Sequence, residues 1–129
     1  MTDNNYEGFH SSFNNSLGLI QQIDGLLNQA TTHYISGSLS SAWRCLRAIQ
    51  GRVIQLCSPE EIKVLDGAAE KAGSYIEASK QFRNSESPNR QVDMTALKLY
   101  EKYNEMIMRK LHDSKLLLQA KKDASRMNF

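Results

Sequence analysis

The stretch that decides the fold runs from Asp93 to Arg126 and reads DMTALKLYEKYNEMIMRKLHDSKLLLQAKKDASR. It contains no Gly or Pro, and most of its residues favour helices. It therefore predicts one helix about 50 Å long, at 1.5 Å per residue. Steps of three and four residues along it define a single seam, made of Leu97, Tyr100, Asn104, Ile107, Leu111, Ser114 and Leu118. The charged residues fall on other faces, as in an amphipathic helix.

No other segment of the chain is long enough to cover this helix over its full length. We expect its second half to protrude from a single-chain bundle, and Leu116, Leu117 and Leu118 there to need a partner. The seam also carries Asn104 and Ser114, and polar residues in heptad-like seams commonly fix register and oligomer state. The sequence thus predicts self-association, most simply as a homo-oligomer, or a place as one subunit of a larger complex.

Length and composition indicate one ordinary globular domain. The chain has 129 residues, of which 40% are hydrophobic and 23% charged, with a net charge of +2. Disordered and strongly charged tail proteins differ from this composition. No apolar run approaches the roughly 20 residues of a membrane span, and the N-terminus lacks the regions of a signal peptide. We therefore expect a cytoplasmic protein that makes no membrane contact.

The N-terminal 15 residues are poor in helix formers, yet Tyr6, Phe9 and Phe13 recur at spacings of three and four. We predict an N-terminal arm over residues 1–15 and a helical bundle domain over residues 16–129. Two interpretations of the arm stay open. It is either a frayed extension of the first helix, or an arm that docks its aromatic side chains on its own bundle or on a neighbour.

Two helices are predicted before residue 58. The first begins with Ser16 as N-cap and ends near Tyr34, ahead of a Gly and Ser break at residues 36–38. The second runs from about Leu39 to Cys57 and has the widest apolar face, so we expect Trp43 to be its largest core residue. On its opposite side lie three arginines, which suit either a solvated face or a phosphate-contacting patch: Arg44, Arg47 and Arg52.

The two cysteines are predicted to stay reduced. Cys45 and Cys57 are twelve residues apart on the second predicted helix, or about 18 Å along its axis. A disulfide requires Cα atoms within about 7 Å. A bridge between these two thiols within one chain is therefore excluded in that helix.

The sharpest local signal is Ser58-Pro59-Glu60-Glu61, with Ser at the N-cap, Pro at the first helical position and Glu three residues after the cap. A third helix is predicted to begin there, with an inner face rich in alanine. The polar segment 84–90 ends it, and Asp93 is predicted to cap the long last helix. The expected fold is all-α, a four-helix antiparallel bundle with an overlong C-terminal helix.

The sequence contains no assembled catalytic constellation. It contains a single Glu-x-x-His spacing, from Glu7 to His10, whereas bundle metalloenzymes carry such a pair on each of two helices, and its three histidines have no metal-ligand spacing between them. Phosphate-cradling glycine loops and nucleophile elbows do not occur either. We therefore predict a protein that is not an enzyme and that holds no cofactor or metal. Its function is expected to be non-enzymatic protein binding, as an interaction module or a structural subunit of a larger assembly.

The candidate protein interface combines the second half of the last helix with the N-terminal aromatics. Its members are Leu111, Leu116, Leu117, Leu118, Met127, Phe129, Tyr6, Phe9 and Phe13. An alternative interpretation is a nucleic-acid-binding accessory protein, because residues 109–129 carry six basic and two acidic side chains. The candidate nucleic-acid contacts are Arg109, Lys110, Lys115, Lys121, Lys122 and Arg126. These six do not share one face, so they predict a basic rod more than a surface that reads a groove.

Overall fold

The structure is a computed structural model that describes residues 3–84 and 90–127, with side chains described for 17–84 and 90–126. The described chain is almost entirely α-helical and holds no strand. Its elements are α1 (Asp3–Ile35), α2 (Leu39–Val53), the short 3-10 helix η1 (Ile54–Leu56), α3 (Pro59–Asn84) and α4 (Arg90–Met127). The prediction of an all-α protein is confirmed. Within these ranges, no helix is both long and apolar enough to cross a membrane.

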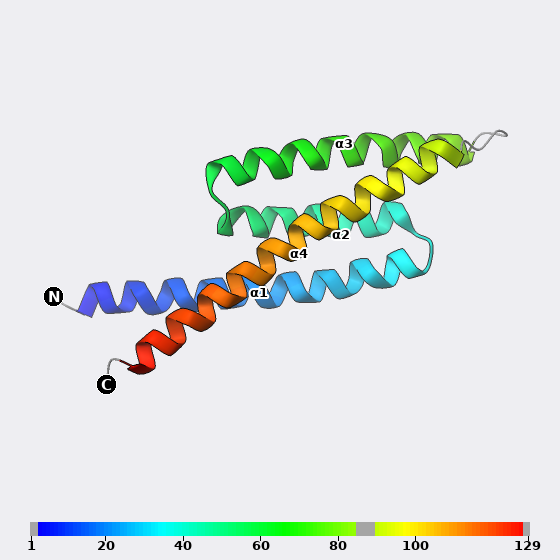
Figure 1. The fold of residues 1–129 in the computed structure, drawn as a ribbon. Helices are drawn as coiled ribbons and strands as arrows, with labels where there is room; N and C mark the ends of the chain where they lie inside the picture. Colours follow the sequence, from blue (N-terminus) through cyan, green and yellow to red (C-terminus); the bar gives the residue numbers. More distant parts are fainter. Residues whose placement is uncertain (1–2, 85–89, 128–129) are drawn as a thin grey trace.

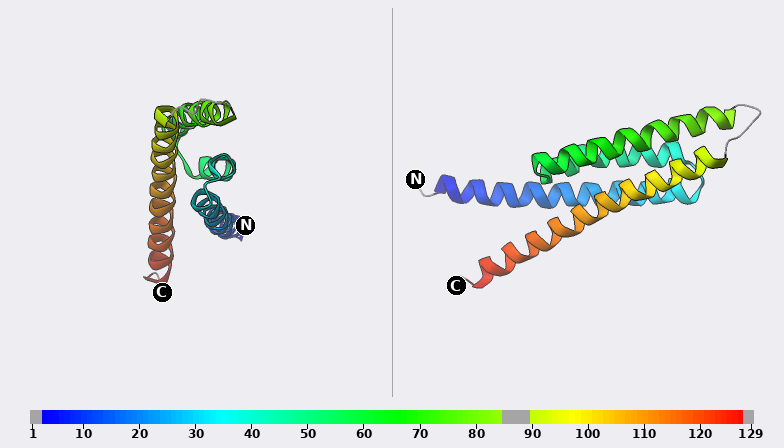
Figure 2. Two further views of the ribbon diagram at one scale, coloured as in Figure 1. Left: turned by 90° about the vertical axis from the view of Figure 1, so that its right-hand side faces the viewer. Right: turned by 45° about the horizontal axis from the view of Figure 1, so that its top comes forward.

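Helices α1, α2 and α3 lie side by side, and α4 crosses all three on one face (Figures 1 and 2). The hairpins α1–α2 and α3–α4 supply most of the contact between elements. With 38 residues, α4 is about 57 Å long, whereas the 15 residues of α2 reach only about 22 Å. Consequently, the N-terminal part of α1 and the C-terminal part of α4 extend beyond α2 and α3 and diverge from each other (Figures 1 and 2).

The turn between α1 and α2 is fixed by Gly37, which has a φ of +80° and ends α1 in the left-handed conformation. The backbone N–H of Ser38 donates to the carbonyl of His33 at 2.8 Å, and that of Gly37 donates to the carbonyl of Tyr34 at 3.0 Å. This pair of bonds is the Schellman motif, which satisfies the last carbonyls of a helix. It confirms the predicted break at residues 36–38.

Several predicted helix boundaries were wrong. Helix α1 begins at Asp3, so the backbone passes Ser16 without interruption. The α-helix after Leu39 ends at Val53, and η1 follows. Helix α4 begins at Arg90, which puts Asp93 in its first turn instead of at its cap. There Asp93 accepts a hydrogen bond from the Ser79 hydroxyl of α3 and lies 3.4 Å from the Arg83 guanidinium, so it joins α3 to α4.

The core lies where α4 crosses the other helices. Its fully buried side chains of largest volume are Tyr103, Ile23, Leu46, Ile49, Ile107 and Val53. Trp43, which we predicted as the largest core residue of the second helix, is only partly buried and packs against the core, and the largest fully buried side chain is that of Tyr103 on α4. The indole of Trp43 packs against the ring of Tyr103 at 5.1 Å and against the backbone of Gly73 on α3. The small residue at position 73 allows α3 to approach the indole closely.

Candidate protein-binding surface on helices α1 and α4

Helix α4 changes character at Leu111. Before that residue it is a core helix, with Tyr100, Tyr103, Ile107 and Leu111 all at most 3% exposed. After it, no described residue of the helix is fully buried, and every residue from 119 to 126 is exposed although the backbone stays helical. The other helices of the chain therefore bury only the first half of α4, and the second half lies exposed on the surface.

The predicted interface residues on α4 divide into three groups. Leu111 is 3% exposed and belongs to the core, so its assignment to a surface was wrong. Leu118 is partly buried and packs against that core. Leu116 and Leu117 are 57% and 58% exposed to solvent.

The remaining predicted interface residues have side chains outside the described residues. Tyr6, Phe9 and Phe13 lie on the helical backbone of α1, whose first turns replace the separate arm that we considered. The α4 backbone is helical up to Met127. Phe129 lies beyond the described chain. The interface role of these four aromatic residues and of Met127 therefore stays a prediction.

The exposed leucines lie on the side of α4 that faces away from the core. At 100° per residue, Leu116, Leu117, Ala120 and Ala124 share one face, and Leu118 points from the opposite one. Two leucines followed by two alanines give a smooth apolar stripe on which another helix backbone can lie closely. We had grouped Leu116, Leu117 and Leu118 as three consecutive leucines, although only Leu118 belongs to the predicted seam, and the structure separates Leu118 from the other two.

A groove of about 360 Å³ opens between α1 and α4, where the two helices begin to diverge. Its apolar floor is formed by Leu17, Ile20 and Leu118, and Lys115 and Lys122 stand at its rim. Leu17 is 42% exposed, whereas Ile20 is 4% exposed. The groove thus marks the end of the intrachain packing between these helices.

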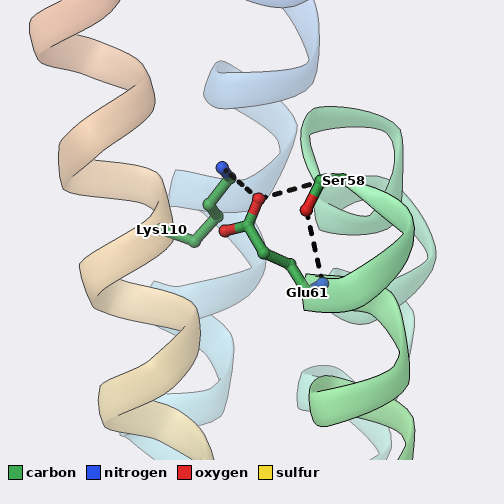
Figure 3. A network of polar contacts seen from close by, with 3 residues as sticks. All are labelled: Ser58, Glu61 and Lys110. Carbon is green, nitrogen blue, oxygen red and sulfur yellow. Dashed lines mark hydrogen bonds and ion pairs between the residues drawn. The ribbon is translucent and has the colours of Figure 1, made fainter.

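Lys110, one of the six candidate basic residues, makes its contacts within the chain. Its ammonium lies 3.1 Å from the Glu61 carboxylate at the start of α3 (Figure 3). Glu61 also accepts the backbone N–H of Ser58 at 3.0 Å, and the Ser58 hydroxyl accepts the N–H of Glu61, which confirms the predicted capping box. The Ser58 N–H, followed by Lys110, holds the pKa of the Glu61 carboxyl below its usual value. Lys110 therefore helps to fasten α4 to α3.

Three other basic residues form a stripe that the sequence analysis missed. Lys115, Lys122 and Arg126 are spaced seven and four residues apart, so they lie on the groove side of α4. Lys115 pairs with Asp24 of α1 at 3.1 Å. Lys122 and Arg126 form no ion pair with any side chain described in residues 17–84 and 90–126. The six basic residues do not share one face as a set, but these three do.

A second group of polar contacts joins α2 to α3 around the buried side chain of Gln50. Gln50, 4% exposed, accepts a hydrogen bond from the Arg47 guanidinium at 2.6 Å and donates one to Asp66. Arg52 donates to Gln22 and to the carbonyl of Ala48. Two of the three arginines predicted on this side of α2 thus make intrachain hydrogen bonds, which neither of the two interpretations, a solvated face or a phosphate-contacting patch, had included.

The remaining groups of chemical interest are isolated. Cys45 and Cys57 are free and partly buried, and burial raises the pKa of the Cys57 thiol. Cys57 lines a pocket of about 290 Å³ between α3 and α4, together with Val64, Leu65 and Met106. Among the described residues, no three His, Cys, Asp or Glu side chains come close enough together to hold a metal ion.

Comparison with known proteins adds no relative: no family model, no curated protein and no solved structure matches the chain.

Proposed function

We propose that this protein is a non-enzymatic interaction module, or a structural subunit of a larger assembly, that binds another protein through the C-terminal half of α4. In this proposal the chain is a four-helix antiparallel bundle with an overlong last helix. The first half of α4 completes the core, and the second half presents the leucine stripe to the partner. The partner is another copy of the chain or a different protein.

One observation carries the proposal. Residues 119–126 are helical, yet all of them are exposed, and the leucines just before them are more than half exposed. A helix end of this length without packing is marginal in water, because helix formation needs either tertiary contacts or many residues. Apolar side chains that a helix presents to solvent in a stripe are typical of helix-in-groove recognition. A partner that covers Leu116 and Leu117 would supply the missing packing.

The test compares the full chain with two variants, Leu117→Asp on the leucine stripe and a chain that ends at Leu118. Because the described residues among those deleted, 119–126, are all exposed, we expect the melting temperature to change little. Recovery of the partner from the native source should instead fall sharply. A matched control, Met94→Asp, changes a side chain of similar exposure, 58%, at the other end of α4 and should leave recovery unchanged. Recovery of the partner that is equal for the full chain and the chain that ends at Leu118 would refute the proposal. A large drop in the melting temperature of the shortened chain would show that the tail belongs to the core.

A second candidate function is nucleic-acid binding through the basic stripe of Lys115, Lys122 and Arg126. Two of these three cations have no acidic partner among the described side chains. Binding to phosphates releases counterions, so affinity falls steeply between about 50 and 200 mM salt. Fluorescence anisotropy with labelled single- and double-stranded DNA and RNA provides the test. Absence of binding at the lower salt concentration would discard this function.

A further inference from the structure

A single row of exposed side chains runs along the leucine stripe of α4. Its members are spaced four, three and four residues apart, as in one seam of a heptad pattern: Asp113, Leu117, Ala120 and Ala124. All four side chains are exposed, and all lie in the described part of the helix. The row has a large side chain in one half and two small ones in the other. It therefore suits an inverted copy of itself, because the leucine of each copy then packs over an alanine of the other.

The charged groups around this row differ from those of the basic stripe, which lies on the other side of α4. Lys115 of the basic stripe pairs with Asp24 of α1 at 3.1 Å, so α1 occupies that other side. The row itself contains the acidic Asp113, and Lys121 flanks it. Neither of these two groups forms an ion pair with any other side chain that the structure describes. The row thus offers one free acidic and one free basic group to a partner.

We propose that two copies of the chain pair through this row, antiparallel to each other, with Leu117 of each copy packed over Ala120 of the other. The inference rests on the proposed function, because it uses the same half of α4, and it names the partner as a second copy. In this register Asp113 of one copy lies within about 4.5 Å along the helix axis of Lys121 of the other. The two-fold axis repeats this attraction, so the pair contains two such contacts and closes as a dimer.

Charge and the shape of the bundle both select the antiparallel arrangement. In a parallel pair Asp113 would meet Asp113 and Lys121 would meet Lys121, and such like charges repel each other. The antiparallel register overlaps residues 110–127 of the two helices, a length of about 27 Å. This overlap ends at Lys110, which pairs with Glu61 at the start of α3 (Figure 3). The paired segment is therefore the part of α4 that extends beyond α3 (Figures 1 and 2).

The first experiment exchanges the two charges in the full-length chain. A helix pair of this length forms a small interface, so sedimentation equilibrium should give a dissociation constant on the order of 10–100 μM. Asp113→Lys alone and Lys121→Asp alone should each raise it about tenfold, because two weak ion pairs are replaced by repulsion. The variant that carries both changes should return to the value of the unaltered chain. The matched control, Lys122→Asp, makes the same charge change on the other side of α4 and should leave the dissociation constant unchanged.

The second experiment tests the packing of Leu117 over Ala120. Ala120→Leu keeps a good helix former and adds apolar surface at an exposed position, so nonspecific association would become stronger. In the proposed pair the larger side chain meets Leu117 of the other copy and keeps the two helices apart. The dissociation constant should therefore rise about tenfold, while the melting temperature of the dilute chain stays the same.

The outcomes separate this inference from the function on which it rests. A chain that stays monomeric up to about 1 mM would overturn the dimer and leave a different protein as the partner of the leucine stripe. A dimer that the double charge exchange fails to restore, or that Ala120→Leu strengthens, would overturn the antiparallel contact. The proposed function falls as well only if Leu117→Asp and the chain that ends at Leu118 leave both the dimer and the recovery of a partner unchanged.

Discussion

Replacing Leu111 with Ala is expected to destabilise the chain by about 2–3 kcal/mol. Leu111 is 3% exposed and belongs to the core cluster. Leu→Ala changes at such sites cost about 2–5 kcal/mol, depending on how far the surroundings relax into the cavity. Leu111 is the last fully buried residue of α4, about two turns before the partly buried Leu118. We therefore expect its surroundings to relax into the cavity, which favours the lower part of that range. The loss is a substantial fraction of the about 5–15 kcal/mol that stabilises a typical domain.

The same change six residues later should have almost no effect on folding. Leu117 is 58% exposed, and surface substitutions usually alter stability by less than about 0.5 kcal/mol. Thermal unfolding followed by circular dichroism should therefore show a melting temperature about 10 °C lower for Leu111→Ala and nearly unchanged for Leu117→Ala. The measurement should be made at a protein concentration at which the chain is monomeric. Equal losses for the two variants would refute the division of α4 into a core half and a surface half.

Three further predictions concern the polar groups of the core and the cap. Tyr103→Phe should keep or slightly raise stability in urea unfolding, because the buried Tyr103 hydroxyl has no hydrogen-bond partner among the described residues. Ser58→Ala should cost about 1 kcal/mol in the same assay through loss of the capping box. The lowered pKa of Glu61 means that its carboxylate stabilises the fold fully above the ordinary pKa of 4.5, and that this stabilisation is lost as pH falls through the lowered pKa. The free energy of unfolding of Glu61→Gln, measured in urea at several pH values, should therefore fall less over this acidic range than that of the unaltered chain.

Much of the helix pattern was predictable, because local chemistry fixes it. The left-handed Gly37 and the capping box at Ser58 end and begin helices through bonds between residues a few positions apart, and sequence shows such signals directly. The start of α1 was missed because Asn- and Ser-rich segments have low helix propensity on average. In the structure, residues 3–15 continue the helix of a better helix-forming segment that follows them.

The candidate surface was only half predictable. Periodicity identified an apolar seam on α4, but it could not decide whether that seam faces the chain or a partner. The answer depends on where α4 crosses the other helices, which buries Tyr103 and Leu111 and leaves Leu116 and Leu117 open. The partial burial of Trp43 also depends on where α4 crosses, because α4 places Tyr103 in the centre of the core and Trp43 packs against its ring. The basic stripe beside the groove likewise required knowing which side of α4 meets α1.

The central claim is that the C-terminal half of α4 is held by a partner and not by its own chain, and amide hydrogen exchange tests it most directly. Exchange of residues 112–126 is compared between the dilute chain and the associated state, with residues 96–111 of the same helix as the internal reference. We predict fast exchange of residues 112–126 in the dilute chain and strong protection on association, while the reference residues stay protected in both. Protection of residues 112–126 that is the same in both states would contradict the claim.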